Sequence, residues 1–114
     1  MHDANINKII KTVCKLFDTD YETLNTKNRA HEFVLARQTV FYFTKKTTKI
    51  PLALVGKIFN RNHATVIHGI RTYENLLATD KHIRETHNRI ASTLMRPDDA
   101  FVDYDELMEI YNKL

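Results

Sequence analysis

Apolar side chains recur every three or four residues along most of this chain, which is the spacing of amphipathic helices. The first such segment covers residues 5–17, and a short turn over residues 21–25 follows it, with Leu24 pointing inward. A second segment, residues 29–44, contains no glycine or proline, and its wide apolar surface predicts a central helix covered on more than one side. The positions expected to be buried in the two long helices are Ile6, Ile9, Ile10, Val13, Leu16, Phe17, Phe33, Leu35, Ala36, Val40, Phe41, Tyr42 and Phe43.

The second half of the chain continues this pattern in three further segments. Pro51 suits the first turn of a helix over residues 51–59, because the N–H that proline lacks is not needed there. Asn60 and Arg61 form a tight turn, and Asn62 is a favourable N-cap for the next helix. The expected core positions are Val66, Ile70, Tyr73 and Leu77 in that helix, and Ile83, His87, Ile90 and Leu94 in a last one over residues 80–95.

Composition supports an all-α fold with a single core. The 114 residues include only two glycines and two prolines, whereas turn-rich β structures need more of both. An apolar fraction of 43% is enough for one core at this size. We therefore expect one helical domain over residues 1–96 and a tail over residues 97–114. A short helix capped by Asp103 is expected in the tail, with an apolar stripe formed by Leu107, Ile110, Tyr111 and Leu114.

Charge divides the chain at the same boundary. Residues 1–96 carry 16 Lys and Arg against eight Asp and Glu, whereas the tail carries six acidic residues against Lys113. A basic body with an acidic tail is one pattern found in proteins that bind polyanions. Three roles are open for the tail: it could dock on a partner protein, mediate dimerisation, or cover the basic surface of the same chain.

A short helix, a tight turn and a longer helix form a helix-turn-helix, here with residues 52–59 as the first helix and residues 63–77 as the second. In this motif the first residues of the second helix meet base edges in the major groove. The face opposite Val66 and Ile70 carries small and polar residues, with no acidic residue in its first turn. These residues are Ala64, His68, Arg71, Thr72 and Asn75.

The stretch of residues 52–68, LALVGKIFNRNHATVIH, resembles a known family. It is similar to the signature of the C-terminal DNA-binding domain of DnaA, the bacterial replication initiator, which reads approximately L-x-x-I-G-x-x-F-G-G-R-D-H-T-T-V-x-H. Upstream, Arg29, Arg37-Gln38 and Lys45 fit a second part of the family pattern. The resemblance extends over residues 6–94, and it implies a helical bundle related to the Trp repressor.

The resemblance also implies a function and a set of contacts. The family domain binds double-stranded DNA at an asymmetric, A·T-containing nonamer, the DnaA box, in replication initiation or its regulation. Arg29 matches the arginine that enters the minor groove, where a narrow A·T-rich groove attracts positive charge. Positions that read bases in the major groove are Asn62, His63 and Ala64. Positions that hold the phosphate backbone are Arg37, Gln38, Lys45, Thr65 and His68.

Three departures from the family pattern bear on which bases are recognised. Asn62 replaces an aspartate, and an amide can donate as well as accept, which relaxes a preference for the cytosine amino group. Ala64 replaces a threonine, keeping a methyl group but losing a hydroxyl. The turn of residues 59–61 is one residue shorter than the family's F-G-G-R.

Enzymatic and metal-binding functions have little support. The two glycines, Gly56 and Gly69, cannot supply a G-x-x-x-x-G-K-[ST] loop, so nucleotide binding and ATP hydrolysis by that route are not expected. Among the six histidines, His63 and His68 are five residues apart, whereas a shared metal on a helix prefers a spacing of four. His87 falls on an apolar stripe and is expected in the core. No cofactor is predicted.

The single cysteine, Cys14, cannot form an internal disulfide and is expected to be buried. No apolar run approaches the roughly 20 residues of a membrane span, and residues 1–5 lack the features of a signal peptide. A cytoplasmic protein without membrane contact is therefore expected. Two alternatives to replication stay open: a helix-turn-helix transcriptional regulator, and a helical protein–protein adaptor that does not bind DNA.

Overall fold

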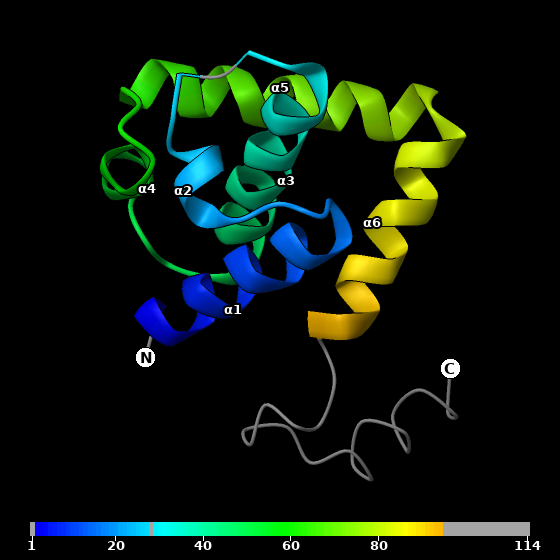
Figure 1. The fold of residues 1–114 in the computed structure, drawn as a ribbon, viewed down its shortest axis with the longest axis horizontal. Helices are drawn as coiled ribbons and strands as arrows, with labels where there is room; N and C mark the ends of the chain where they lie inside the picture. The colour runs from blue at the N-terminus through cyan, green and yellow to red at the C-terminus, as the bar shows by residue number, and fades with distance from the viewer. Residues whose placement is uncertain (1, 28, 95–114) are drawn as a thin grey trace, which may run out of the picture.

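Six helices make up the described part of the chain, residues 2–27 and 29–94 of a computed structural model, and no strand occurs among these residues (Figure 1). The helices are α1 (His2–Leu16), α2 (Tyr21–Leu24), α3 (His31–Thr47), α4 (Leu52–Ile58), α5 (His63–Thr79) and α6 (Lys81–Leu94). The all-α prediction is thus confirmed. The predicted tail and its helix at Asp103 lie outside the described residues.

The central helix α3 differs from its predicted bounds at both ends. It begins two residues later than expected because Ala30 is the N-cap, and the N–H of Phe33 donates to the Ala30 carbonyl. It also runs three residues beyond Thr44, to Thr47. Lys45 and Lys46 lie in this last turn, where positive charge interacts favourably with the helix dipole.

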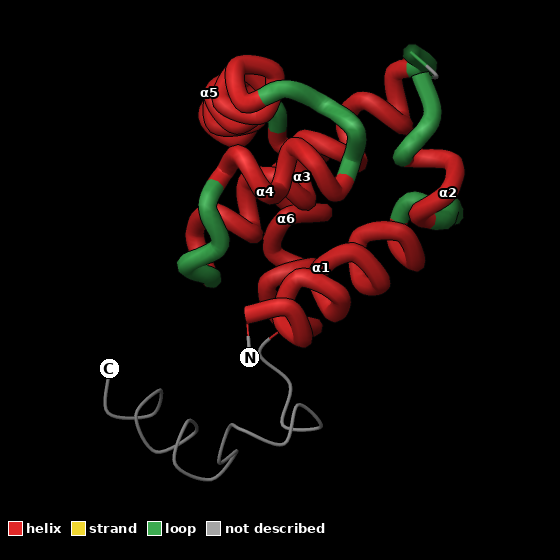
Figure 2. The backbone as a smooth tube through the Cα atoms, turned by 90° about the vertical axis from the view of Figure 1, so that its left-hand side faces the viewer, coloured by secondary structure: helices red, strands yellow, loops and turns green. Residues whose placement is uncertain are grey.

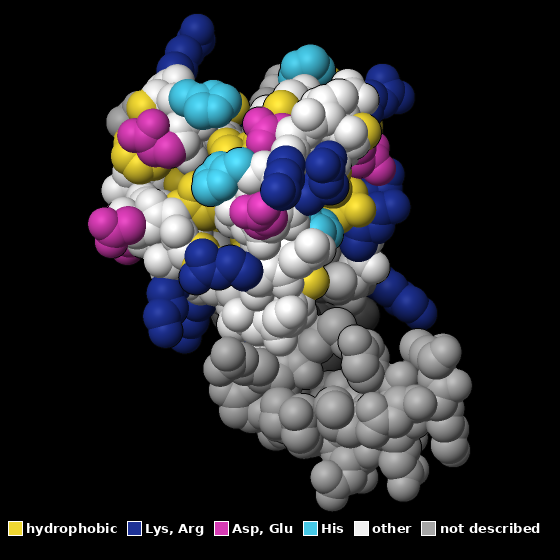
Figure 3. Space-filling view, turned by 90° about the vertical axis from the view of Figure 1, so that its right-hand side faces the viewer, with side chains coloured by type: hydrophobic (Ala, Val, Ile, Leu, Met, Phe, Trp, Pro, Cys, Tyr) yellow, Lys and Arg dark blue, Asp and Glu magenta, His cyan; other side chains and the backbone are white. Residues whose placement is uncertain are grey.

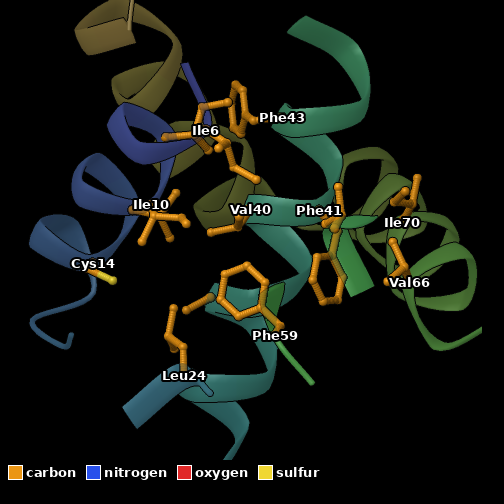
Figure 4. Packing of buried hydrophobic residues seen from close by; sticks show 14 of the residues in the cluster. Ile6, Ile10, Cys14, Leu24, Val40, Phe41, Phe43, Phe59, Val66 and Ile70 are labelled. Carbon is orange, nitrogen blue, oxygen red and sulfur yellow. The ribbon is translucent and has the colours of Figure 1, made fainter. Parts of the chain in front are cut away.

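Helix α3 is covered on several sides, as its wide apolar surface predicts. Figure 1 shows α5 crossing one end of α3, with α1 on another side and α6 running from the end of α5 back to α1. The close-up in Figure 4 shows α1, α2, α3 and α5 contributing to one core. Ala36, Val40, Phe41 and Phe43 of α3 are buried, whereas Phe33, Leu35 and Tyr42 are half-buried around them.

The side chains predicted for the other helices occupy this core with few exceptions. Leu24 of the short helix α2 is fully buried. The same is true of Val13 in α1, of Val66 in α5 and of Ile90 in α6, whereas Leu77 and Leu94 are half-buried. One hydrophobic core therefore joins all the helices and fixes α5 against α3.

His87 belongs to an aromatic cluster at the contact of α3, α5 and α6. Its ring stacks on Phe43 with 4.7 Å between the ring centroids, and its Nδ1 lies 3.0 Å from the hydroxyl of Tyr73. Tyr42 packs against both Tyr73 and His87. His87 is thus half-buried at the edge of the core rather than fully enclosed in it, and burial lowers the pKa of its imidazole.

Candidate nucleic-acid interface

Helices α4 and α5 are joined by a turn that depends on close backbone approach. The N–H of Arg61 donates to the carbonyl of Gly56 at 2.7 Å. A Cβ added to Gly56 would lie 2.5 Å from the carbonyl oxygen of Arg61, so this position requires glycine. Asn60 adopts a left-handed conformation with φ of 55°, which asparagine tolerates better than most residues. The four residues 59–62 thereby change the direction of the chain between the two helices.

Asn62 caps helix α5, as its sequence position predicts. Its backbone is extended, and its side-chain oxygen accepts a 2.8 Å hydrogen bond from the N–H of Thr65. The N–H groups of His63 and Ala64 have no carbonyl acceptor within the helix, because a helical N–H bonds to the carbonyl four residues earlier. The exposed start of α5 thus combines unpaired backbone donors with the positive end of the helix dipole.

The two faces of α5 divide as the apolar pattern predicts. Val66, Ile70 and Tyr73 are buried, and Gly69 lets the helix approach Phe41 of α3 closely. On the opposite face all residues are exposed except Thr72, which is half-buried. The exposed residues of that face are Ala64, His68, Arg71 and Asn75.

Five of the nine site residues expected from the sequence therefore lie together at the exposed start of α5. They are Asn62, His63, Ala64, Thr65 and His68. Gln38 of α3 is half-buried beside this helix, since a Cβ at Gly69 would lie 3.3 Å from its Cγ. Arg29 is exposed just before α3, and Lys45 is exposed in the last turn of α3.

Arg37 is placed differently from the other site residues. It is only 7% exposed, and its Nη1 donates to the carbonyl of Leu24 at the end of α2, at 3.0 Å. Burial, followed by the positive charge of Arg61, lowers the pKa of the Arg37 guanidinium. A phosphate contact needs accessible N–H groups, and the structure leaves little of this side chain in solvent.

A set of contacts that sequence analysis missed joins α2 to the turn of the helix-turn-helix. The guanidinium of Arg61 donates to the carbonyls of Phe59 at 2.5 Å, Asn25 at 3.5 Å and Thr26. Two further contacts connect the same regions: the hydroxyl of Tyr21 donates to the carbonyl of Ile58, and the Nζ of Lys27 lies 3.5 Å from the carbonyl of Asn60. Apart from Phe59, which is two residues from Arg61, the partners are 33 to 37 residues apart, so no local pattern reveals these contacts.

The loop after α2 and the loop between α4 and α5 consequently run next to each other (Figure 2). Arg29 follows the first loop and Asn62 ends the second. The fold thus brings the two regions expected to contact the minor and the major groove to the same end of the molecule.

The side of the domain formed by α6 differs from the start of α5 in its charged residues. Figure 3 shows acidic, basic and histidine side chains intermixed on this side. Lys81 and Glu85 approach to 3.9 Å there, one turn apart and both exposed. By contrast, the first turn of α5 contains no acidic residue.

Within residues 2–27 and 29–94, no group of three or more His, Cys, Asp or Glu side chains could hold a metal ion.

A capped, exposed helix held by a tight turn against a shorter helix defines a helix-turn-helix protein. Residues 6–72 match the family described as the bacterial DnaA protein helix-turn-helix, and the chain belongs to this family.

Relatives from several bacteria show the same similarity, and each carries the name chromosomal replication initiator protein DnaA. The protein of Flavobacterium psychrophilum is 40% identical over 84 residues, covering 73% of this chain and 18% of the relative. The protein of Bacteroides thetaiotaomicron is 38% identical over 94 residues, covering 82% of this chain and 20% of the relative. The protein of Oleidesulfovibrio alaskensis is 41% identical over 70 residues, covering 61% of this chain and 15% of the relative. The chain thus matches about a fifth or less of the length of these proteins.

Among the helices of the described residues, none is both long enough and apolar enough to cross a bilayer.

Proposed function

We propose that this chain binds double-stranded DNA at a DnaA-box-like site and acts in replication initiation or its regulation. The observation that carries the proposal is the exposed start of α5, where Asn62, His63 and Ala64 project from a helix whose opposite face is fixed in the core. An α-helix presented in this way fits the major groove of B-DNA. Family membership gives the nature of the ligand, since the relatives are named replication initiators.

The proposed contacts divide into base-reading and phosphate-holding groups. His63 and Asn62 supply ring nitrogens and an amide for base edges, and Ala64 supplies a methyl group for contact with thymine. Thr65, His68 and Lys45 are exposed, and each is proposed to contact a phosphate. Arg29 is exposed before α3, and its proposed site is the adjacent minor groove.

Gln38 and Arg37 take supporting roles in this proposal. Gln38 lies half-buried against α5, and its proposed phosphate contact rests on the part of its side chain that remains accessible. Arg37 is largely buried and bonded to the end of α2, and its proposed role is to hold α2 in place. Its proposed effect on DNA binding is therefore indirect.

The proposal describes a binding domain in the cytoplasm rather than an enzyme. Neither a nucleotide nor a cofactor is part of it, because the sequence has no phosphate-binding loop of the ATPase type. The domain is proposed to span residues 1–96. The acidic residues 97–114 are proposed to contact replication proteins.

Selection from random duplex oligonucleotides at a fixed salt concentration tests the proposal directly. Enrichment of a nonamer related to the DnaA box is expected, with the largest deviation at the base pair facing Asn62. The salt concentration matters because phosphate contacts make the affinity strongly dependent on ionic strength. Failure to enrich any sequence, together with equal binding to unrelated duplexes, would contradict a sequence-specific role.

A further inference from the structure

Arg61 occupies the junction between the two proposed DNA-contacting regions. Its backbone belongs to the turn before α5, and its N–H holds that turn closed against Gly56. Its side chain crosses to the end of α2, where it donates to the carbonyls of Asn25 and Thr26. One residue thus bonds both loops at once.

The acceptors of Arg61, at the C-cap of α2 and one residue beyond it, are the kind that a guanidinium satisfies best. Carbonyls at a helix C-terminus have no partner within the helix and carry its partial negative charge. Two arginines meet this end of α2, since Arg37 donates to Leu24 from α3 and Arg61 donates to the next two residues. The planar fork of arginine reaches several acceptors from fixed directions, which the point charge of lysine cannot do.

The positions joined by Arg61 are short distances along the chain from the proposed contacts. Arg29 follows Thr26 by three residues, which span at most about 10 Å even when fully extended. Asn62 is the next residue after Arg61, and His63 follows it. Movement of the α2 end relative to the turn would therefore change the spacing between Arg29 and the start of α5.

We propose that Arg61 is a positioning residue that sets Arg29 for the minor groove at a fixed distance from the major-groove contacts of α5. This inference rests on the proposed function, and it assigns Arg61 no contact with a base. Loss of the Arg61 side chain leaves both proposed DNA-contacting regions in place but removes its hydrogen bonds from the turn before α5 to the loop after α2. The contribution of Arg29 to binding then falls, whereas that of His63 is retained.

The test uses the full chain and the duplex enriched in the selection, with adenines in the expected minor-groove segment replaced by 2,6-diaminopurine. This base places an amino group in the minor groove, as guanine does, and leaves the major-groove edge unchanged. Wild type should lose roughly tenfold in affinity on the substituted duplex. R29A and R61A should bind the two duplexes equally, and R61K should resemble R61A because a single ammonium cannot span the carbonyls.

Two controls separate positioning from general damage or loss of charge. R89A removes an exposed positive charge from α6, and it should keep the wild-type loss on the substituted duplex. Adding H63A to the R61A variant should weaken binding by about the same factor as adding H63A to the wild type. A collapsed helix-turn-helix would show no such further loss. R61K retains the packed stem of the side chain, so the test stays decisive if R61A does not fold.

The outcomes distinguish this inference from the proposed function. The inference is overturned if folded R61A or R61K keeps the wild-type loss on the diaminopurine duplex, or if R29A shows that Arg29 contributes nothing in the minor groove. If wild type prefers no duplex in the selection, the proposed function itself fails.

Discussion

The side-chain oxygen of Asn62 accepts a 2.8 Å hydrogen bond from the backbone N–H of Thr65, so the residue that starts α5 is both a helix cap and a proposed base contact. These two roles can be separated by substitution. Asn62→Asp keeps the cap and places a negative charge at the helix N-terminus, where it is favourable. Asn62→Ala loses the cap.

We expect Asn62→Ala to lower the free energy of unfolding by about 1 kcal/mol and Asn62→Asp to leave it unchanged or slightly raised. In duplex selection, Asn62→Asp should gain a preference for cytosine at the facing position, because a carboxylate accepts from the cytosine amino group and cannot donate. Urea unfolding and repeated selection measure the two effects. An unaltered base preference in Asn62→Asp would remove Asn62 from the base-reading set.

His63 and Lys45 should differ in how their loss affects specificity. His63→Ala is expected to cost about 1–3 kcal/mol of binding on the selected duplex and little on unrelated duplexes. Lys45→Ala should weaken binding to all duplexes alike and lower the slope of log affinity against log salt by about one. Binding titrations at three salt concentrations distinguish them. Equal, salt-independent effects of the two substitutions would argue against the division into base and phosphate contacts.

Substitution by alanine should destabilise the protein at one of its two glycines and have little effect at the other. Gly56→Ala places a Cβ 2.5 Å from the Arg61 carbonyl, and neither backbone can move without opening the turn. A loss of about 1–3 kcal/mol in unfolding free energy is expected, together with weaker DNA binding. Gly69→Ala is the matched control, since its Cβ would meet only side chains of Phe41 and Gln38, at 3.1 and 3.3 Å.

Helix propensity favours alanine over glycine by up to about 1 kcal/mol, which offsets the mild crowding at Gly69. The thermal midpoint of the Gly69→Ala variant should therefore stay near that of the wild type. A Gly56→Ala variant as stable as Gly69→Ala would show that the turn between α4 and α5 can relax.

His87 makes stability depend on pH in a predictable direction. Burial lowers the pKa of its imidazole in the folded state, whereas the unfolded chain has a value of about 6.5. The unfolded state therefore binds the proton more readily, and the stabilising contribution is present above pH 6.5 and is lost as the pH falls below that value. The thermal midpoint should be lower at pH 5.5 than at pH 7.5.

His87→Phe removes this titration while keeping an aromatic ring against Phe43, so its midpoint should change less between the two pH values. His82→Phe serves as the control, because His82 is exposed on the same helix. A pH dependence as steep in His87→Phe as in the wild type would assign the effect to other groups.

Local sequence signals were sufficient for the helices and for the start of α5. The core stripe of Val66, Ile70 and Tyr73 follows directly from helical spacing, and the cap at Asn62 from its side-chain chemistry. Both depend on neighbours within four residues. The same is true of the turn at Asn60, although the sequence does not show that Gly56 has to admit the Arg61 carbonyl.

The position of Arg37 and the contacts of Arg61 depend on tertiary packing. Arg37 lies on a helix with apolar residues around most of its circumference, and a local pattern cannot tell whether its guanidinium reaches solvent or the end of α2. Arg61 bonds residues 35 and 36 positions away. Such contacts follow only once α2 and the turn have been brought together by Leu24, Phe59 and the rest of the core.

The joint made by Arg61 also has a consequence for how this domain can diverge. All its acceptors are backbone carbonyls, which every amino acid provides, so the joint does not depend on the side chain at position 26. Substitutions in the loop that leads to Arg29 can therefore accumulate while the loop keeps its place beside α5. The surface proposed to face the duplex can change in sequence, and with it the bases preferred at the proposed minor-groove contact, while the fold stays the same.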